Sequence, residues 1–300
     1  VFGVKVYVTL NTILYDNELS SAKALAQSLA DVGVDALIVQ DFSFLSMGLE
    51  IPLHASTQMD NRSADKVELL GKLGFEQVVL ARELGLGEIL KIHEQCPDIT
   101  LEAFVHGALC VSYSGKCYAS QYCFGRSANR GECAQFCRLS FDLEDEGGNV
   151  LVSDRHLLSL KDMNRSMYIE DMADAGVSSF KIEGRLKDMT YVKNVTAFYR
   201  KAIDELIARR PDDYQRSSNG CSEVCFEPNP NKTFNRGFTD YYLLRSQENV
   251  SSLNTPKSIG ESVGEVRKVG ENFITVGGTT KFHNGDGICF FNANNVLCGC

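Results

Sequence analysis

Short apolar runs alternate with amphipathic stretches through the first two-thirds of the chain. The first run, residues 4–11 (VKVYVTLN), is rich in β-branched and aromatic residues, and residues 19–32 then carry apolar side chains at helical spacing. Further predicted strands lie at residues 36–41, 52–56, 77–81, 101–106 and 179–183, and further predicted helices at residues 64–73, 86–94, 169–175 and 189–208. Strands that alternate with helices predict a parallel sheet.

The number of strand–helix units separates two α/β architectures. The chain contains six such units, whereas a closed barrel of this class has eight. Because the chain opens within a strand, we expect two further units upstream of it. The alternative, an open doubly wound sheet, typically carries a G-x-G-x-x-G turn, which this sequence lacks. We therefore predict an α/β fold with a TIM-like (βα) barrel over residues 1–210 that is incomplete at its N-terminus.

The pattern changes in the last third of the chain. Residues 211–257 are rich in Asn, Ser, Pro and Gly and have few periodic runs, which indicates a linker or an extension. From residue 258 onward, β-type runs at 262–269, 273–276 and 288–291 are separated by glycine-containing turns. We expect residues 258–300 to begin a β-rich C-terminal module, a small β-barrel.

Charge and hydropathy exclude some classes of protein. The 39 acidic and 30 basic residues give a net charge of −9, which does not suggest a general nucleic-acid binder, although a local basic cluster can still bind one. No apolar run approaches the roughly 18 residues that a membrane-spanning helix needs, so we expect no membrane association. The first residues lack the pattern of a signal peptide. We therefore expect a cytoplasmic protein.

Cysteines form the strongest chemical signal. Four of the eleven, Cys110, Cys117, Cys133 and Cys137, fall within residues 107–140, which we interpret as an insertion after a strand. Without a secretion signal, clustered thiols favour metal binding or catalysis over disulfides. Four thiolates can hold a [4Fe–4S] cluster. Structural zinc usually uses two tight pairs, and only the second pair is tight here, so the spacing favours the cluster while zinc or unliganded thiols stay open. Cys123 is interpreted as a non-ligand.

At this point the sequence resembles a known family. The run EAFVHGALCVSYSGKCYAS over residues 102–120 resembles the signature of the peptidase U32 family, with Ala119 in place of a larger aliphatic residue as its one departure. The blocks at residues 53–58, 129–138 and 180–185 resemble the family as well. The resemblance implies an incomplete barrel and a [4Fe–4S] cluster held by the four cysteines named above.

The resemblance also implies a chemistry. The better-understood family members are similar to RNA or quinone hydroxylation factors that do not use molecular oxygen, and the RNA members depend on prephenate. Residues 123–133 and the β-module most resemble the branch that makes 5-hydroxycytidine in 23S rRNA. This implies an RNA hydroxylase with prephenate as co-substrate, RNA as partner, and accessory electron-transfer or iron–sulfur assembly proteins. The alternatives are a collagenase-like peptidase, for which no H-E-x-x-H or G-x-S-x-G occurs, and hydroxylation of a tRNA uridine.

Four side chains at predicted strand ends are candidates for catalysis, since barrel active sites gather at the carboxyl ends of the strands. His54 and His106 could hold a substrate or transfer a proton, and Glu183 could do acid–base work. Arg185 could bind a phosphate or carboxylate through its guanidinium. The alternatives are that the histidines are satisfied core residues and that Glu183 joins structural ion pairs.

Arginines and aromatic residues accompany the cysteines. The arginines could form a basic rim for RNA or neutralise the charge of a cluster. The aromatic rings could stack on a flipped base or pack around the cluster. These residues are Arg126, Arg130, Arg138, Tyr113, Tyr118, Tyr122 and Phe124.

Overall fold

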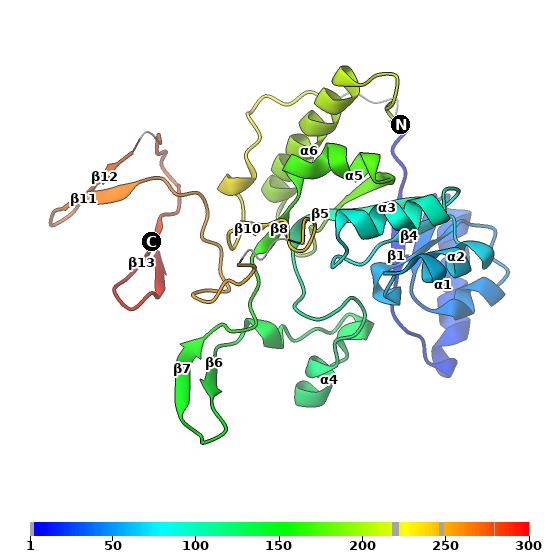
Figure 1. The fold of residues 1–300 in the computed structure, drawn as a ribbon, viewed down its shortest axis with the longest axis horizontal. Coiled ribbons are helices and arrows are strands. Elements are labelled where there is room, and N and C mark those ends of the chain that lie inside the picture. The colour runs from blue at the N-terminus through cyan, green and yellow to red at the C-terminus, as the bar shows by residue number, and fades with distance from the viewer. Residues whose placement is uncertain (1–2, 218–221, 246–248, 279, 300) are drawn as a thin grey trace.

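The main body of the protein is an eight-stranded sheet flanked by helices (Figure 1). The computed structural model describes residues 3–217, 222–245, 249–278 and 280–299. Six strands pair in parallel in the spatial order β1, β2, β3, β4, β5, β9. Their bounds are Tyr7–Leu10, Ala36–Val39, Leu53–Ala55, Gln77–Val79, Thr100–Ala108 and Val177–Ile182. Each lies at a predicted strand, which confirms a mixed α/β fold with a parallel sheet.

The helices of this body lie where apolar periodicity predicts them. They are α1 (Leu19–Asp31), α2 (Ala64–Lys72), α3 (Leu86–Gln95), α5 (Ile169–Asp174) and α6 (Met189–Arg209). Short 3-10 helices lie at Asp16–Glu18, Phe42–Ser46, Thr57–Met59, Ala128–Arg130, Phe136–Arg138, Ser166–Tyr168 and Pro230–Lys232. All four residues of β2 are buried, as expected for a parallel strand covered on both faces. Among the described helices, none is long and apolar enough to cross a membrane.

Strand β5 is the junction of the fold. Its first half lies between β4 and β9, and its last residues pair in antiparallel fashion with β8 (Asp162–Asn164). Strand β8 in turn pairs in parallel with β10 (Phe238–Thr239). Gly107 makes the junction possible: its φ is +105°, and a β carbon there would lie 2.6 Å from the carbonyl oxygen of Glu183. The described strands do not close into a ring, so the TIM-like barrel is not confirmed.

Residues 211–257, expected as a linker or extension, include β10 and therefore join the edge of this sheet. Tyr241 and Leu243, which follow β10, are buried. Farther along, β11 (Glu265–Val269) pairs with β12 (Ile274–Gly277), and β13 (Cys289–Phe291) pairs with β14 (Leu297–Gly299). These two antiparallel hairpins stand apart from the sheet in Figure 1. They show β-structure in this region, and a β-barrel is not confirmed.

The cysteine-rich insertion leaves the sheet at the end of β5. It contains α4 (Ala119–Phe124) and is followed by a hairpin of β6 (Phe141–Glu144) and β7 (Val150–Arg155). In Figure 1, α4 and this hairpin project from the side of the body that faces away from α6. The insertion therefore stands over the carboxyl ends of the parallel strands.

Candidate functional site

A cavity of about 800 Å³ lies between the carboxyl ends of the parallel strands and the cysteine-rich insertion. Asn11 follows β1, residues 56–58 follow β3, and Arg82 follows β4; all of them line this cavity. Lys181 and Ile182 at the end of β9, and Glu183 and Arg185 just after it, line the cavity as well. We call this space the main cavity.

All four candidate cysteines line the main cavity. Cys110, Cys117 and Cys137 are partly buried, Cys133 is exposed, and all four are free thiols. Burial raises the pKa of the Cys110 and Cys137 thiols, and the neighbouring cysteines raise both further. Cys123, in contrast, is exposed and does not line the cavity.

The insertion has almost no core of its own. Between residues 110 and 138 the buried residues are Ser120 and Asn129, and both are polar. A segment of this length without buried apolar side chains needs another source of order, and a bound metal group is a common one. Four soft thiol donors around one cavity match the ligand set of a [4Fe–4S] cluster in kind and in number.

The four thiols are not grouped around a single ion position. Within the described residues, no three His, Cys, Asp or Glu side chains are grouped so that they could hold one metal ion. In a cubane cluster each thiolate binds a different iron, so the four sulfurs stand farther apart than the ligands of a single zinc ion. The described thiols are accordingly not grouped as the ligands of one zinc ion are.

Glu183 is fixed between two arginines at the edge of the cavity. Arg82 donates from Nη2 to Glu183 Oε2 at 3.0 Å, and the backbone N–H of Arg185 donates to Oε1 at 2.9 Å. The Arg82 guanidinium also lies over the Phe104 ring, 3.9 Å from its centroid. The Arg185 side chain donates to the carbonyl of Gly131 at 3.2 Å and thus links the end of β9 to the insertion.

Lys181 is paired within the sheet. Its Nζ lies 2.5 Å from Oε1 of Glu102, a buried residue that also accepts hydrogen bonds from Gln77 and Ser179 at 2.7 Å each. This network joins β4, β5 and β9. Structural ion pairing therefore accounts for Glu102, while Lys181 also reaches the cavity wall.

The structure places both candidate histidines in the core and not at the main cavity. The His54 ring packs edge-on against Tyr7 at 4.7 Å between centroids, and His106 is 1% exposed, with Nδ1 3.3 Å from Tyr199 Oη. Burial lowers the pKa of both, that of His106 to about 4. The expectation that these histidines face the cavity is corrected, because their side chains point from the strands into the packed interior.

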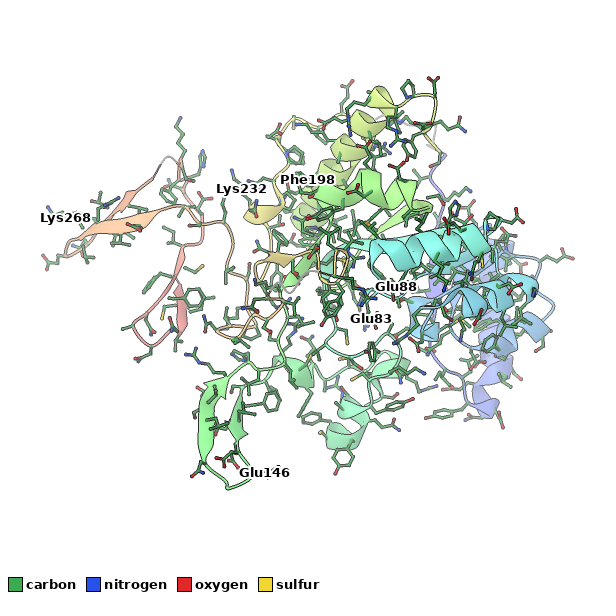
Figure 2. The ribbon with its side chains drawn as sticks, in the orientation of Figure 1. Glu83, Glu88, Glu146, Phe198, Lys232 and Lys268 are labelled. Atoms are coloured by element: carbon green, nitrogen blue, oxygen red, sulfur yellow. The ribbon has the colours of Figure 1, made fainter. Side chains whose placement is uncertain are left out.

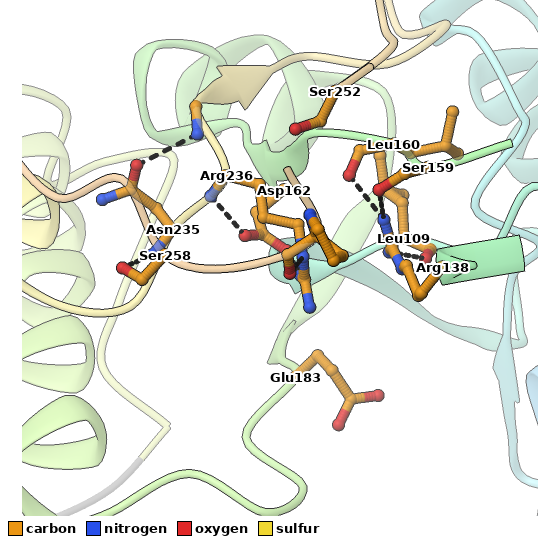
Figure 3. A network of polar contacts seen from close by, with 12 residues as sticks. Leu109, Arg138, Ser159, Leu160, Asp162, Glu183, Asn235, Arg236, Ser252 and Ser258 are labelled. Atoms are coloured by element: carbon orange, nitrogen blue, oxygen red, sulfur yellow. Dashed lines mark hydrogen bonds and ion pairs between the residues drawn. The ribbon is translucent and has the colours of Figure 1, made fainter. Parts of the chain in front are cut away.

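Two of the three arginines near the cysteines are tethers. Arg130 bonds both carboxylate oxygens of Glu18, at 2.9 and 2.6 Å, and lies over the Tyr15 ring. Arg138 donates to Ser159 Oγ and to the carbonyls of Leu160 and Leu109, at 2.7, 2.7 and 3.0 Å (Figure 3). These contacts tie the insertion to the rest of the protein.

Arg126, the third arginine, is exposed. Of the aromatic candidates, Tyr113 and Tyr118 line the main cavity. Phe124 packs against Phe136, with the ring centroids 6.1 Å apart, and Tyr122 is 92% exposed and does not line the cavity.

Arg82 is the site residue that the sequence reasoning missed. It directly follows the buried run QVVLA, and a charged residue at the carboxyl end of a buried strand was the available signal. Its role depends on a contact with Glu183, 101 positions along the chain, which no local pattern reveals.

The fold and the site together define an α/β protein with a parallel sheet whose carboxyl edge carries a four-cysteine segment. Residues 2–252 match the model of Peptidase family U32, and the chain belongs to this family.

Several relatives are similar over most of the chain. The chain is 50% identical over 288 residues to the 23S rRNA 5-hydroxycytidine C2501 synthase of Escherichia coli (strain K12), covering 96% of this chain and 44% of that protein. It is 34% identical over 256 residues to a collagenase of Porphyromonas gingivalis, covering 81% and 60%. It is 30% identical over 304 residues to tRNA hydroxylation protein P1 of Bacillus subtilis (strain 168), covering 97% and 70%. The chain thus spans less than half the length of the E. coli synthase.

Proposed function

We propose that this protein is an iron–sulfur enzyme that hydroxylates a pyrimidine in RNA, namely a cytidine of 23S rRNA. The observation that carries the proposal is the convergence of four thiols and the charged strand ends on one cavity. The 50% identity to a 23S rRNA 5-hydroxycytidine synthase supports the choice of substrate.

In this proposal Cys110, Cys117, Cys133 and Cys137 hold a [4Fe–4S] cluster at the wall of the main cavity. With all four irons bound by thiolates, the cluster supplies electron transfer and order to the insertion, and it offers no open iron to a substrate. Accessory electron-transfer or iron–sulfur assembly proteins are proposed as partners on the same basis. Binding, orientation and proton transfer are then tasks for the side chains of this chain.

The arginines at the main cavity are the proposed anion-binding groups. Guanidinium groups bind phosphates and carboxylates through two parallel hydrogen bonds, and Arg82 and Arg185 both line the cavity beside Glu183. We propose that Arg185 contacts the RNA backbone or the carboxylates of prephenate, the proposed co-substrate. Glu183, held on both oxygens by its hydrogen bonds, is positioned to accept a proton at Oε1 or Oε2.

The polar residues after β1 and β3 are proposed to recognise the cytidine base. Asn11 donates to Ser56 Oγ at 3.2 Å, and Gln58 lies beside them on the cavity wall. Amide and hydroxyl groups can hydrogen-bond the Watson–Crick edge of a base that has left its stack. A cytidine in the main cavity would meet this polar wall on one side and the cysteine-rich insertion on the other.

Two alternatives follow from the relatives. The collagenase relatives suggest a peptidase, but a cysteine or serine nucleophile needs an adjacent base, and no histidine of the described chain lines the main cavity. The tRNA hydroxylation relatives suggest a tRNA uridine as substrate.

One experiment separates these functions. Cells that lack the protein are complemented with the full-length wild type, with Cys117→Ser, or with the control Cys123→Ala, and their 23S rRNA and tRNA are analysed by mass spectrometry. We expect 5-hydroxycytidine in 23S rRNA with the wild type and Cys123→Ala, and its loss with Cys117→Ser. A change confined to tRNA uridine would show that the substrate is tRNA. Gelatin cleavage by the purified protein, with unchanged RNA in the cells, would show that the protein is a peptidase.

A further inference from the structure

A second cleft, of about 590 Å³, adjoins the main cavity. Val111, Ser112 and Tyr113 line both spaces, so the first residues of the insertion form a wall that the two share. The other walls of the cleft come from Arg62, from Glu83 and Leu84, from Glu88 on α3, and from Tyr241, Tyr242 and Arg245 after β10; Figure 2 labels Glu83 and Glu88. We call this space the tyrosine cleft.

Flat aromatic faces line the tyrosine cleft. The Arg62 guanidinium lies 4.2 Å from the centroid of the Tyr113 ring, which is nevertheless 60% exposed. On the opposite segment, the rings of Tyr241 and Tyr242 lie 4.3 Å apart at an angle of 39°. Tyr241 is buried and has a φ of +62°, while Tyr242 is 39% exposed. Tyr241 thus has a backbone conformation that is rare for a bulky residue, and both tyrosines line the cleft.

The charges in the tyrosine cleft are balanced. Glu83 accepts hydrogen bonds from the backbone N–H and the hydroxyl of Ser114 at 2.7 and 3.0 Å. Glu88 accepts from the backbone N–H of Gly85 at 2.9 Å and pairs with Arg245. Two arginines therefore face two carboxylates that are already engaged. A balanced cleft with aromatic walls suits a neutral, flat group better than a phosphate.

We propose that the tyrosine cleft binds the nucleobase of a nucleotide next to the one that enters the main cavity. The inference rests on the proposed RNA substrate and adds a second base subsite to it. A base that is modified inside a cavity must leave its stack, so its neighbour loses a stacking partner. Tyrosine rings and guanidinium planes can replace that partner whatever the base. Because the two spaces share a wall, two neighbouring nucleotides of one RNA strand could occupy them side by side.

The test measures binding of a fluorescein-labelled single-stranded RNA of about ten residues, with one central cytidine, to the full-length protein. We expect Tyr113→Ala and Tyr242→Ala to raise the Kd about fivefold or more, in line with the loss of one base–aromatic stack. Tyr242→Phe keeps the ring and should bind like the wild type. The matched control is Tyr122→Ala, because Tyr122 is 92% exposed and lines neither space.

A second probe, with an abasic residue beside the cytidine, identifies the partner of the ring. The wild type should bind this probe about as weakly as Tyr242→Ala binds the intact RNA, and Tyr242→Ala should lose nothing further. If Tyr242→Ala lowers the melting temperature, Tyr242→Leu keeps apolar volume without a flat ring and should still bind weakly. Wild-type affinity in Tyr113→Ala, Tyr242→Ala and Tyr242→Leu would show that the tyrosine cleft binds no base. The proposed RNA substrate would not be affected by that result. If the wild type fails to bind the intact RNA, both the proposed RNA substrate and the base subsite are contradicted.

Discussion

At the scale of single residues, neighbouring charged groups of the same type have different tasks. Arg130 and Arg138 make several hydrogen bonds each and fasten the insertion. Arg185 lines the main cavity, and in the described part of the chain its guanidinium donates only to the Gly131 carbonyl. A guanidinium has five N–H donors. Arg185 therefore has donors to offer to an anionic substrate in the main cavity, whereas Arg138 uses three of its donors as a tether and does not line that cavity.

We expect Arg185→Ala to lower RNA hydroxylation by at least tenfold, about 1.4 kcal/mol of transition-state stabilisation, while the iron content stays unchanged. Arg185→Lys should restore activity only in part, because an ammonium cannot form the bidentate contact. The matched control is Arg209→Ala, since Arg209 is 63% exposed and pairs with Glu170 at the end of α6. Full activity of Arg185→Ala, or loss of its iron, would make Arg185 a structural residue.

His106 gives the fold a pH dependence of its own. Burial lowers its pKa from 6.5 to about 4, so below pH 6.5 the unfolded chain takes up this proton more readily than the folded one. The stability that neutral His106 provides is complete above pH 6.5 and is lost as the pH falls toward 4. The full loss is on the order of 3 kcal/mol.

Urea unfolding of the iron-free protein at pH 7.5, 6 and 5 checks this. His106→Phe should show a shallower fall of the unfolding midpoint than the wild type, and His283→Gln, a change at an exposed histidine, should keep the wild-type slope. Equal slopes for wild type and His106→Phe would show that the folded state takes up this proton as readily as the unfolded chain, and would contradict a lowered pKa.

At the scale of elements, the insertion depends on close backbone approaches. Gly115 has a φ of +73°, and a β carbon there would collide with the carbonyl oxygen of Gln58 after β3. Gly125 has a similar φ of +64°, but a β carbon there would meet nothing within 4 Å. The two glycines thus share the same backbone conformation and differ only in their surroundings.

We expect Gly125→Ala to lower the free energy of unfolding by about 1–2 kcal/mol, which is the cost of the left-handed backbone conformation for a residue with a β carbon. Gly115→Ala should carry the same cost and should also displace the insertion from the edge of the sheet. Limited proteolysis should therefore cleave Gly115→Ala between residues 110 and 138 faster than Gly125→Ala. Their free energies of unfolding, measured in urea, should fall in the same order. Equal cleavage of both variants would mean that the insertion does not rest on Gln58.

Strands and helices could be predicted where the sequence is periodic, whereas strands of only two or three residues could not. The six parallel strands and the helices beside them follow from apolar runs of several residues. Strand β10 has two residues, and β8 has three, so neither carries enough alternation to be recognised. Their pairing depends on β5 continuing past the end of β4, which is a property of the three-dimensional sheet.

At the scale of the whole molecule, the sequence indicated which chain segments meet at the site, but it did not show which way each side chain points. The carboxyl ends of parallel strands share one edge, so the meeting of residues 56–58, Arg82 and Glu183 at one cavity follows from topology. The histidines were misplaced because a residue at a strand end can face either the cavity or the interior. His106 packs against Tyr199 on the long helix α6, a contact 93 positions away in the chain.

The whole-molecule proposal depends on the four cysteines acting as one ligand set. Because the insertion buries only polar residues, the arginine tethers at its edges should not suffice to order it, and serine in place of any one ligand should loosen it. We expect Cys110→Ser, Cys117→Ser, Cys133→Ser and Cys137→Ser, purified without oxygen, to lose the broad absorption band of the cluster and most of their iron. Protease should then cleave residues 110–138.

The controls for this prediction are two other cysteines. Cys123 lies in the same insertion but is exposed, and Cys96 is buried in the core with its thiol 3.7 Å from the Ala64 carbonyl. Cys123→Ala and Cys96→Ala should keep the band and the iron. The unfolding midpoint of the parallel sheet should change little in the four serine variants, because its core is built from strands and helices outside the insertion. Loss of the band in Cys123→Ala with its retention in Cys117→Ser would show that the ligands are assigned wrongly, and bound zinc in place of iron after anaerobic purification would turn the site into a structural zinc site.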